Sequence, residues 1–106
     1  MHPFFERASG LTETIIAAAI EVHRNKGPGL IEYKGFTREE PLRFDVLVES
    51  CVLVEAKAVE KVLPIHKAQL LSYMKLLNVP VGLLINFHEI KLTDGVHRLI
   101  LPGANR

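Results

Sequence analysis

Two adjacent apolar runs in the middle of the chain, RFDVLVE at 43–49 and VLVEAK at 52–57, decide the fold that we expect. Both runs are rich in β-branched residues, and all their charged residues fall on odd positions. This alternation is typical of strands. Because the connection around Glu49, Ser50 and Cys51 is short, we predict strands over about 42–48 and 52–58 that form an antiparallel hairpin.

Side chains alternate across a strand, so the hairpin has one apolar and one charged face. The apolar face, which we expect to be the core face, carries the even positions Phe44, Val46, Val48, Val52, Val54 and Ala56. The other face carries Asp45, Leu47, Glu49, Leu53, Glu55 and Lys57. Directly opposed residues share a face, so Asp45 can face Glu55 or Lys57 only if the turn holds an odd number of residues or a bulge.

The charged positions have a chemical interpretation. Asp45 followed ten residues later by Glu55-x-Lys57 is the spacing of a metal-dependent phosphodiesterase site. Two carboxylates can hold a hard cation such as Mg²⁺, and an ammonium group can position hydroxide or stabilise phosphate charge. The residues alone leave an alternative open, the solvated outer face of a half-buried hairpin. Leu47 and Leu53 weaken that alternative, because apolar residues on the same face need something to pack against.

We predict the other elements from residues that begin or end helices and strands. We predict one domain over 1–106, with 1–9 and 102–106 loose. A helix over about 12–25 begins at Thr12, or at Ser9 as an alternative cap. The stretch 33–36 could be a short edge strand, and 37–41 a polar loop. Pro64 begins a helix over 64–77 that Asn78 ends. A buried strand at 81–87, a turn at 94–95 and a strand at 96–101 complete the chain, with 81–87 parallel to 52–58.

The predicted helix over 64–77 carries a polar stripe of His66, Gln69 and Tyr73. We place its apolar residues on the opposite side: Ile65, Leu70, Met74 and Leu77. A solvated stripe is the ordinary interpretation. Because this helix directly follows the Glu55-x-Lys57 strand, the stripe could instead face the same site. Gln69 could then orient a phosphate or water, and Tyr73 could contact the substrate backbone.

Composition limits the classes of function that we expect. The chain has 106 residues, 13 basic and 12 acidic side chains and a formal net charge of +1, so a local basic patch rather than a basic stripe would have to serve any nucleic acid. Cys51 is the single cysteine, which excludes an internal disulfide and fits a reducing compartment. No apolar run is long enough to span a bilayer, and residues 1–7 lack a signal-peptide pattern. We expect a cytoplasmic protein.

The succession of motifs over residues 11–100 resembles the small bacterial GxxExxY proteins of the PD-(D/E)xK nuclease superfamily. The resemblance is carried by these segments: Thr12–Arg24, Gly27–Glu32, Tyr33–Gly35, Phe44–Glu49, Val52–Glu60, Leu63–Leu76, Gly82–Phe87 and Asp94–Arg98. It implies an α/β fold, a restriction-endonuclease-like core in which helices flank a mixed sheet. It also implies a hydrolase that acts on nucleic acid, with DNA favoured over RNA.

The resemblance assigns roles residue by residue. Asp45 and Glu55 match the metal ligands for Mg²⁺ or Mn²⁺, and Lys57 matches the catalytic lysine. Glu32 matches the acid of the GxxE motif, an additional ligand or base. The predicted helix over 64–77 carries the other assigned residues. Gln69 is assigned as a catalytic residue, and Tyr73 and His66 are assigned as residues that position the substrate.

The chain departs from the family pattern after Glu32. In the family, GxxE continues into a helix that bears the motif's tyrosine and then into a first strand. Here Tyr33–Gly35 follows Glu32 at once, and Gly35 holds the tyrosine's position. We therefore predict a truncated core that lacks one helix and one strand. Homodimerisation could compensate for an exposed sheet edge. The alternative hypothesis is a catalytically inactive nuclease-fold binding protein, or an internally deleted remnant.

Overall fold

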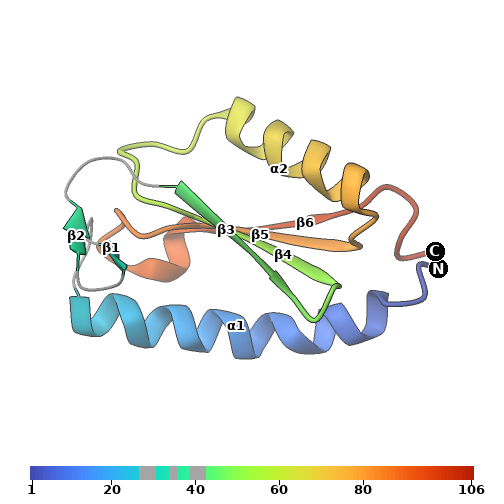
Figure 1. The fold of residues 1–106 in the computed structure, drawn as a ribbon, viewed down its shortest axis with the longest axis horizontal. Coiled ribbons are helices and arrows are strands. Elements are labelled where there is room, and N and C mark those ends of the chain that lie inside the picture. The colour runs from blue at the N-terminus through green and yellow to red at the C-terminus, as the bar shows by residue number, and fades with distance from the viewer. Residues whose placement is uncertain (27–30, 34–35, 39–42) are drawn as a thin grey trace.

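A four-stranded sheet lies between two helices in the computed structural model (Figure 1), which describes residues 1–26, 31–33, 36–38 and 43–106. The strand order is β3-β4-β5-β6. The bounds are Arg43–Val48 for β3, Val52–Lys57 for β4, Val81–Asn86 for β5 and Val96–Ile100 for β6. The β4–β5 pair is parallel and the two outer pairs are antiparallel, so the sheet is mixed. This architecture confirms the predicted α/β class.

Helix α1, Phe5–Lys26, is longer than predicted at its N-terminal end. Thr12 does not cap the helix but lies inside it, where its hydroxyl donates to the Ser9 carbonyl at 2.8 Å. The prediction of a loose segment over 1–9 was wrong because Ala8 is fully buried and Phe5 packs against the core. Burial of apolar side chains on the sheet outweighed the local cap signal.

The two chain ends lie together at one end of the sheet (Figure 1). The His2 amide donates to the Ala104 carbonyl at 2.8 Å, and Ala104 is itself buried. The expectation of a loose tail over 102–106 was therefore wrong. These contacts hold the start of α1 against the segment that follows β6.

Helix α2, Pro64–Leu77, has the predicted bounds. Proline fits the first turn, where the missing amide costs nothing, and Asn78 adopts the left-handed conformation (φ 54°) that ends a helix. Only Leu70 and Met74 are buried within it. The expectation that Ile65 shares their face was wrong, because at about 100° per residue it lies about 140° round the helix from Leu70. Leu77 does lie on that face, about 20° from Leu70, but it is 50% exposed because it occupies the last turn.

A small separate sheet pairs β1, Ile31–Tyr33, with β2, Phe36–Arg38. Thr37 and Arg38 therefore belong to a strand, where a loop was predicted, because they complete an antiparallel pair with β1. The edge strand predicted over 33–36 is replaced by this pair, and its middle residues 34–35 lie outside the described residues. The remainder of the predicted loop, 39–41, also lies outside them.

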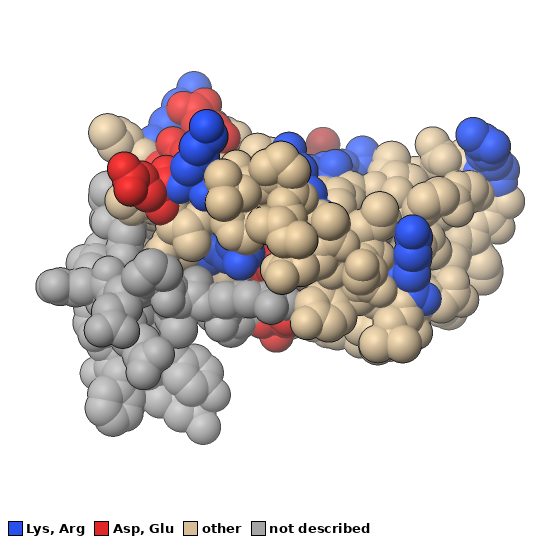
Figure 2. Space-filling model, turned by 90° about the horizontal axis from the view of Figure 1, so that it is seen from above, with Lys and Arg blue, Asp and Glu red and all other residues tan. Residues whose placement is uncertain are grey.

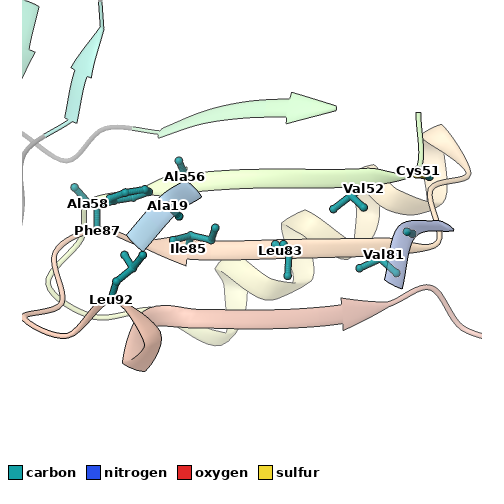
Figure 3. Close-up of a cluster of buried hydrophobic side chains, with 11 residues drawn as sticks. Ala19, Cys51, Val52, Ala56, Ala58, Val81, Leu83, Ile85, Phe87 and Leu92 are labelled. Atoms are coloured by element: carbon teal, nitrogen blue, oxygen red, sulfur yellow. The ribbon is translucent and has the colours of Figure 1, made fainter. Parts of the chain in front are cut away.

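Two clusters of buried apolar residues lie on opposite sides of the sheet. The cluster beneath α1 includes Val52, Ala56, Leu83 and Ile85 (Figure 3). The cluster beneath α2 joins Leu53 and Leu84 to Leu70 and Met74 of the helix. The short 3-10 helix η1, Leu92–Gly95, leads into β6 and covers the predicted turn at 94–95. Among the described residues, no helix combines the length and apolarity that crossing a membrane would require.

Candidate functional site

A three-residue turn sets the register of the β3–β4 hairpin. Val48 pairs with Val52, which leaves Glu49, Ser50 and Cys51 in the turn. Glu49 and Ser50 adopt left-handed conformations (φ 47° and 60°), and the Cys51 amide donates to the Val48 carbonyl at 3.0 Å. With this odd count Asp45 lies directly opposite Glu55. The predicted odd-membered turn and shared face are confirmed.

The face that carries this pair is covered by α2. Leu53, two residues before Glu55 and hence on the same face, packs with Leu70 and Met74 of the helix. Lys57 follows Glu55 on that face, and its register partner on β5 is Asn86. Glu55, Lys57 and Asn86 are 0%, 6% and 0% exposed. The alternative of a solvated outer face is therefore wrong for β4.

The two carboxylates of the hairpin differ in their exposure to solvent. Both carboxylate oxygens of Glu55 are shielded from solvent. Asp45, on edge strand β3, is exposed. Because a buried charge is costly unless it is compensated, the proximity of a buried carboxylate and a buried lysine on one strand indicates a site shaped for charged chemistry.

Asn86 fixes the chain directly after Lys57. Its side-chain amide donates to the Val59 carbonyl at 2.8 Å, and its oxygen accepts from the amides of Val59 at 3.0 Å and His88 at 3.2 Å. The Phe87 amide adds a bond of 2.7 Å to the Lys57 carbonyl. Sequence reasoning missed Asn86, although a lone amide at the end of an apolar strand was the available signal. Asn86 thus holds the segment that carries Lys57 in place.

The polar side chains of α2 are spread around its exposed surface. Lys67 lies near His97 of β6, whose pKa its charge lowers. Gln69 and Tyr73 lie about 160° and 120° round the helix from Lys67 at 100° per residue. Both are exposed, and their contact with a substrate stays a prediction.

His66 has a structural role at the start of α2. Its Nδ1 accepts the Leu63 amide at 2.9 Å, while its own amide donates to the Leu63 carbonyl at 3.0 Å. This reciprocal pair satisfies amides that a helix start leaves without partners. His66 therefore stabilises the helix that covers the site, and a role in contacting substrate stays a prediction.

Glu32 lies in β1, where it pairs with Thr37. Its side chain is outside the described part of the structure, so its role as a further ligand stays a prediction. Among the described side chains, no three carboxylate, imidazole or thiol groups converge as a metal-binding cluster. The described donors at the site are thus the two carboxylates of Asp45 and Glu55. Two hard oxygen donors, one open to solvent, suit Mg²⁺, which usually keeps several waters.

A family model described as the PD-(D/E)XK nuclease superfamily matches residues 30–99, which is 70 of the 106 residues. The chain belongs to this superfamily. The match covers the hairpin, α2, β5 and most of β6, and it contains every residue of the predicted site. No curated protein and no solved structure matches the chain.

Membership in the nuclease superfamily agrees with the placement of the charged residues. Asp45 and the Glu55-x-Lys57 strand form the hairpin that the superfamily's motif names. Superfamily members generally use divalent metals. Glu55 and Lys57 are buried and Asp45 lies opposite Glu55, while the roles of the three residues stay predictions.

Proposed function

We propose that this protein is a metal-dependent nuclease that hydrolyses phosphodiester bonds of nucleic acid, with DNA the favoured substrate. The observation that carries the proposal is the direct pairing of Asp45 with Glu55, beside Lys57, on the face covered by α2. Burying a lysine and a carboxylate would lower the stability of a strand that had only a structural role. Superfamily membership supports the same reaction class.

Each residue has a defined role in the proposal. Asp45 and Glu55 would hold Mg²⁺ or Mn²⁺, and Glu32 would be a third ligand. The bound ion would supply charge neutralisation and a lowered pKa for water. Lys57, nearly buried and on the same face as Glu55, would orient the attacking water and stabilise charge on the phosphate. Gln69 and Tyr73 would bind the substrate backbone, with His66 beside them.

The finer family assignment is also a proposal. The GxxE segment and the succession of motifs favour the GxxExxY proteins, with the helix and first strand after Glu32 deleted. In the described part of the chain β3 is an outer strand of the four-stranded sheet, which supports that deletion, because a preceding strand would pair there.

The test is a nuclease assay on plasmid DNA with Mg²⁺, Mn²⁺ and a chelator. We expect activity that requires the metal and falls at least about 100-fold in Lys57→Ala and in Asp45→Asn. Lys61→Ala is the matched control, because Lys61 is an exposed lysine just beyond β4. Calorimetric titration with Mg²⁺ gives an independent readout, since Asp45→Asn should weaken binding and Lys57→Ala should not. Hydrolysis that persists in both site variants would exclude this site.

A nuclease-fold protein that binds nucleic acid without cutting it is the second candidate. The donor set favours it, because among the described side chains no third group joins Asp45 and Glu55 as a metal ligand. The basic residues on the α2 side are scattered rather than gathered into a stripe (Figure 2), so we expect such binding to be weak. Gel-shift and cleavage assays on the same DNA separate the two functions. Binding without metal-dependent cleavage would support this candidate.

A further inference from the structure

Lys57 is the last residue of β4, and the segment 58–63 that follows it belongs to neither a strand nor a helix. The end of a strand opens easily unless the backbone groups beyond it also have partners. A lysine that must keep one position beside Glu55 therefore stands where its strand is least restrained by the sheet alone. What holds the residues directly after Lys57 decides how firmly its ammonium group is placed.

The side chain of Asn86 acts as a strand partner at this point. Its Nδ2 donates to the Val59 carbonyl at 2.8 Å, and its Oδ1 accepts the Val59 amide at 3.0 Å. These two bonds satisfy both backbone groups of a single residue, as the opposed residue of a neighbouring strand can do. The pairing of β4 is thereby continued two residues beyond Lys57.

The hydrogen bonds of Asn86 also fix which way its amide faces. Its Oδ1 accepts a second amide, that of His88, at 3.2 Å, so both lone pairs of this oxygen are used. Turning the amide over would set its NH₂ group against two N–H donors. Lys57 and Asn86 are register partners, so their side chains leave the sheet on the same face. Because the Asn86 oxygen is already occupied, it does not compete with the carboxylates of that face for the ammonium group.

Asn86 is in turn held by the end of η1. A Cβ on Gly95 would lie 2.6 Å from the Asn86 carbonyl oxygen and 3.2 Å from the Asn86 Cβ, an approach that glycine allows because it has no side chain. Asn86 is fully buried, and the Phe87 amide next to it donates to the Lys57 carbonyl at 2.7 Å. The amide that restrains Val59 thus has a fixed base.

We propose that Asn86 is a positioning residue of the candidate site: it places the ammonium group of Lys57 by holding Val59, and it leaves that group to the carboxylates of Asp45 and Glu55. The part of Asn86 in phosphodiester hydrolysis rests on the proposed function. Its effect on the placement of Lys57 does not, and the two are measured separately.

Acetylation of the full chain with acetic anhydride, followed by mass spectrometry, measures the placement of Lys57 without any activity. Lys57 is 6% exposed and should react slowly in the wild type, and exposed Lys61 should react fast. In Asn86→Ala we expect Lys57 to react at least about tenfold faster and Lys61 to be unchanged. Val81→Ala is the matched control, because Val81 is a fully buried residue of the same strand that packs on the α1 side. Equal acceleration at Lys57 in both variants, or none in Asn86→Ala, would overturn the proposal.

Asn86→Asp is the second variant, which decides the question if Asn86→Ala does not fold. Its carboxylate keeps the shape of the side chain and can accept both amides, but it loses the donor and sets an oxygen against the Val59 carbonyl. We expect Lys57 to be acetylated faster than in the wild type. A wild-type rate at Lys57 in folded Asn86→Asp would overturn the proposal.

Kinetics on plasmid DNA with saturating Mg²⁺ test the part of Asn86 in the reaction. We expect Asn86→Asp to lower kcat at least about tenfold with KM within about twofold, and Val81→Ala to keep the wild-type kcat per folded molecule. Mg²⁺ affinity in calorimetry should be unchanged, because the bonds of Asn86 involve neither Asp45 nor Glu55. A wild-type kcat in Asn86→Asp would overturn the positioning role. A wild-type chain without activity would instead contradict the proposed function, and acetylation would still decide whether Asn86 places Lys57.

Discussion

The two faces of the sheet use the same strands for different purposes. On the α1 side every buried position of β4 and β5 is apolar, including Val52, Ala56 and Leu83. On the α2 side the apolar residues Leu53 and Leu84 share the face with Glu55, Lys57 and Asn86. Burying polar and charged groups costs stability that apolar residues of similar size would not. The α1 face therefore supplies stability, and the α2 face carries buried polar and charged groups that lower it.

The largest effect should come from the α1 face. Leu83→Ala removes a fully buried side chain and leaves a cavity, so we expect the free energy of unfolding to fall by about 3–5 kcal/mol in urea denaturation. Leu76→Ala is the control, because Leu76 is 80% exposed and its loss should cost less than about 0.5 kcal/mol. Equal losses in the two variants would contradict the assignment of the core to this face.

Asn86→Ala should have the next largest effect, by breaking the polar part of the α2 face. The variant loses three hydrogen bonds and leaves backbone groups of Val59 without their partner, so we expect a loss of about 2–3 kcal/mol in the same measurement. Nuclease activity should fall beyond the loss of folded protein, because Lys57 is no longer held. The exposed Asn105→Ala is the control. Unchanged stability in Asn86→Ala would show that the segment after β4 is held by other contacts.

Two glycines give opposite predictions. A Cβ on Gly82 would lie 2.5 Å from the Met74 sulfur and 3.2 Å from Leu70, so Gly82→Ala should push α2 from the sheet and cost about 1–2 kcal/mol. Gly10 lies within α1 with nothing near its Cβ position, so Gly10→Ala should stabilise the protein by about 0.5–1 kcal/mol. Thermal unfolding of both variants checks the pair. A stabilised Gly82→Ala would mean that α2 does not pack closely on β5.

The smallest effect that we predict is a dependence of stability on pH that comes from His97, on the α2 side of the sheet. Burial, and then the charge of Lys67, lower the pKa of His97, while Glu89 opposes the shift. The unfolded chain thus binds the proton more tightly, so His97 contributes stability that is lost as the pH falls below its unfolded pKa of about 6.5. His97→Gln should flatten the fall in stability below that pH, and the exposed His88→Gln should not. Identical pH profiles for His97→Gln and wild type would contradict this.

Local patterns predicted the hairpin and α2 well. The shared face followed from a period of two along β3 and β4, which a shift of one residue would have broken. The bounds of α2 followed from Pro64 and Asn78, whose backbone preferences act without help from the rest of the chain. The shared face of Asp45, Glu55 and Lys57 was predicted for the same reason, since it depends on parity alone.

Non-local packing accounts for what the sequence did not reveal. The early start of α1 depends on Phe5 and Ala8 contacting the sheet, and no local signal marks those contacts. The Asn86 contact joins residues 27 apart in the chain. The burial of Glu55 and Lys57 depends on where α2 crosses the sheet, which its own sequence does not specify. Ile65 was misplaced for a simpler reason, because five residues from Leu70 it lies about 140° round the helix.

The three-residue turn at 49–51 also limits how this chain can change in evolution. Loss or gain of one residue there would make even positions of β3 face odd positions of β4, so β3 would turn over. Asp45 would then point toward α1, away from Glu55, while Val46 would take its place beside the carboxylate. Insertions or deletions of two residues would preserve the pairing. Turn length in related chains should therefore vary in steps of two wherever the site is retained.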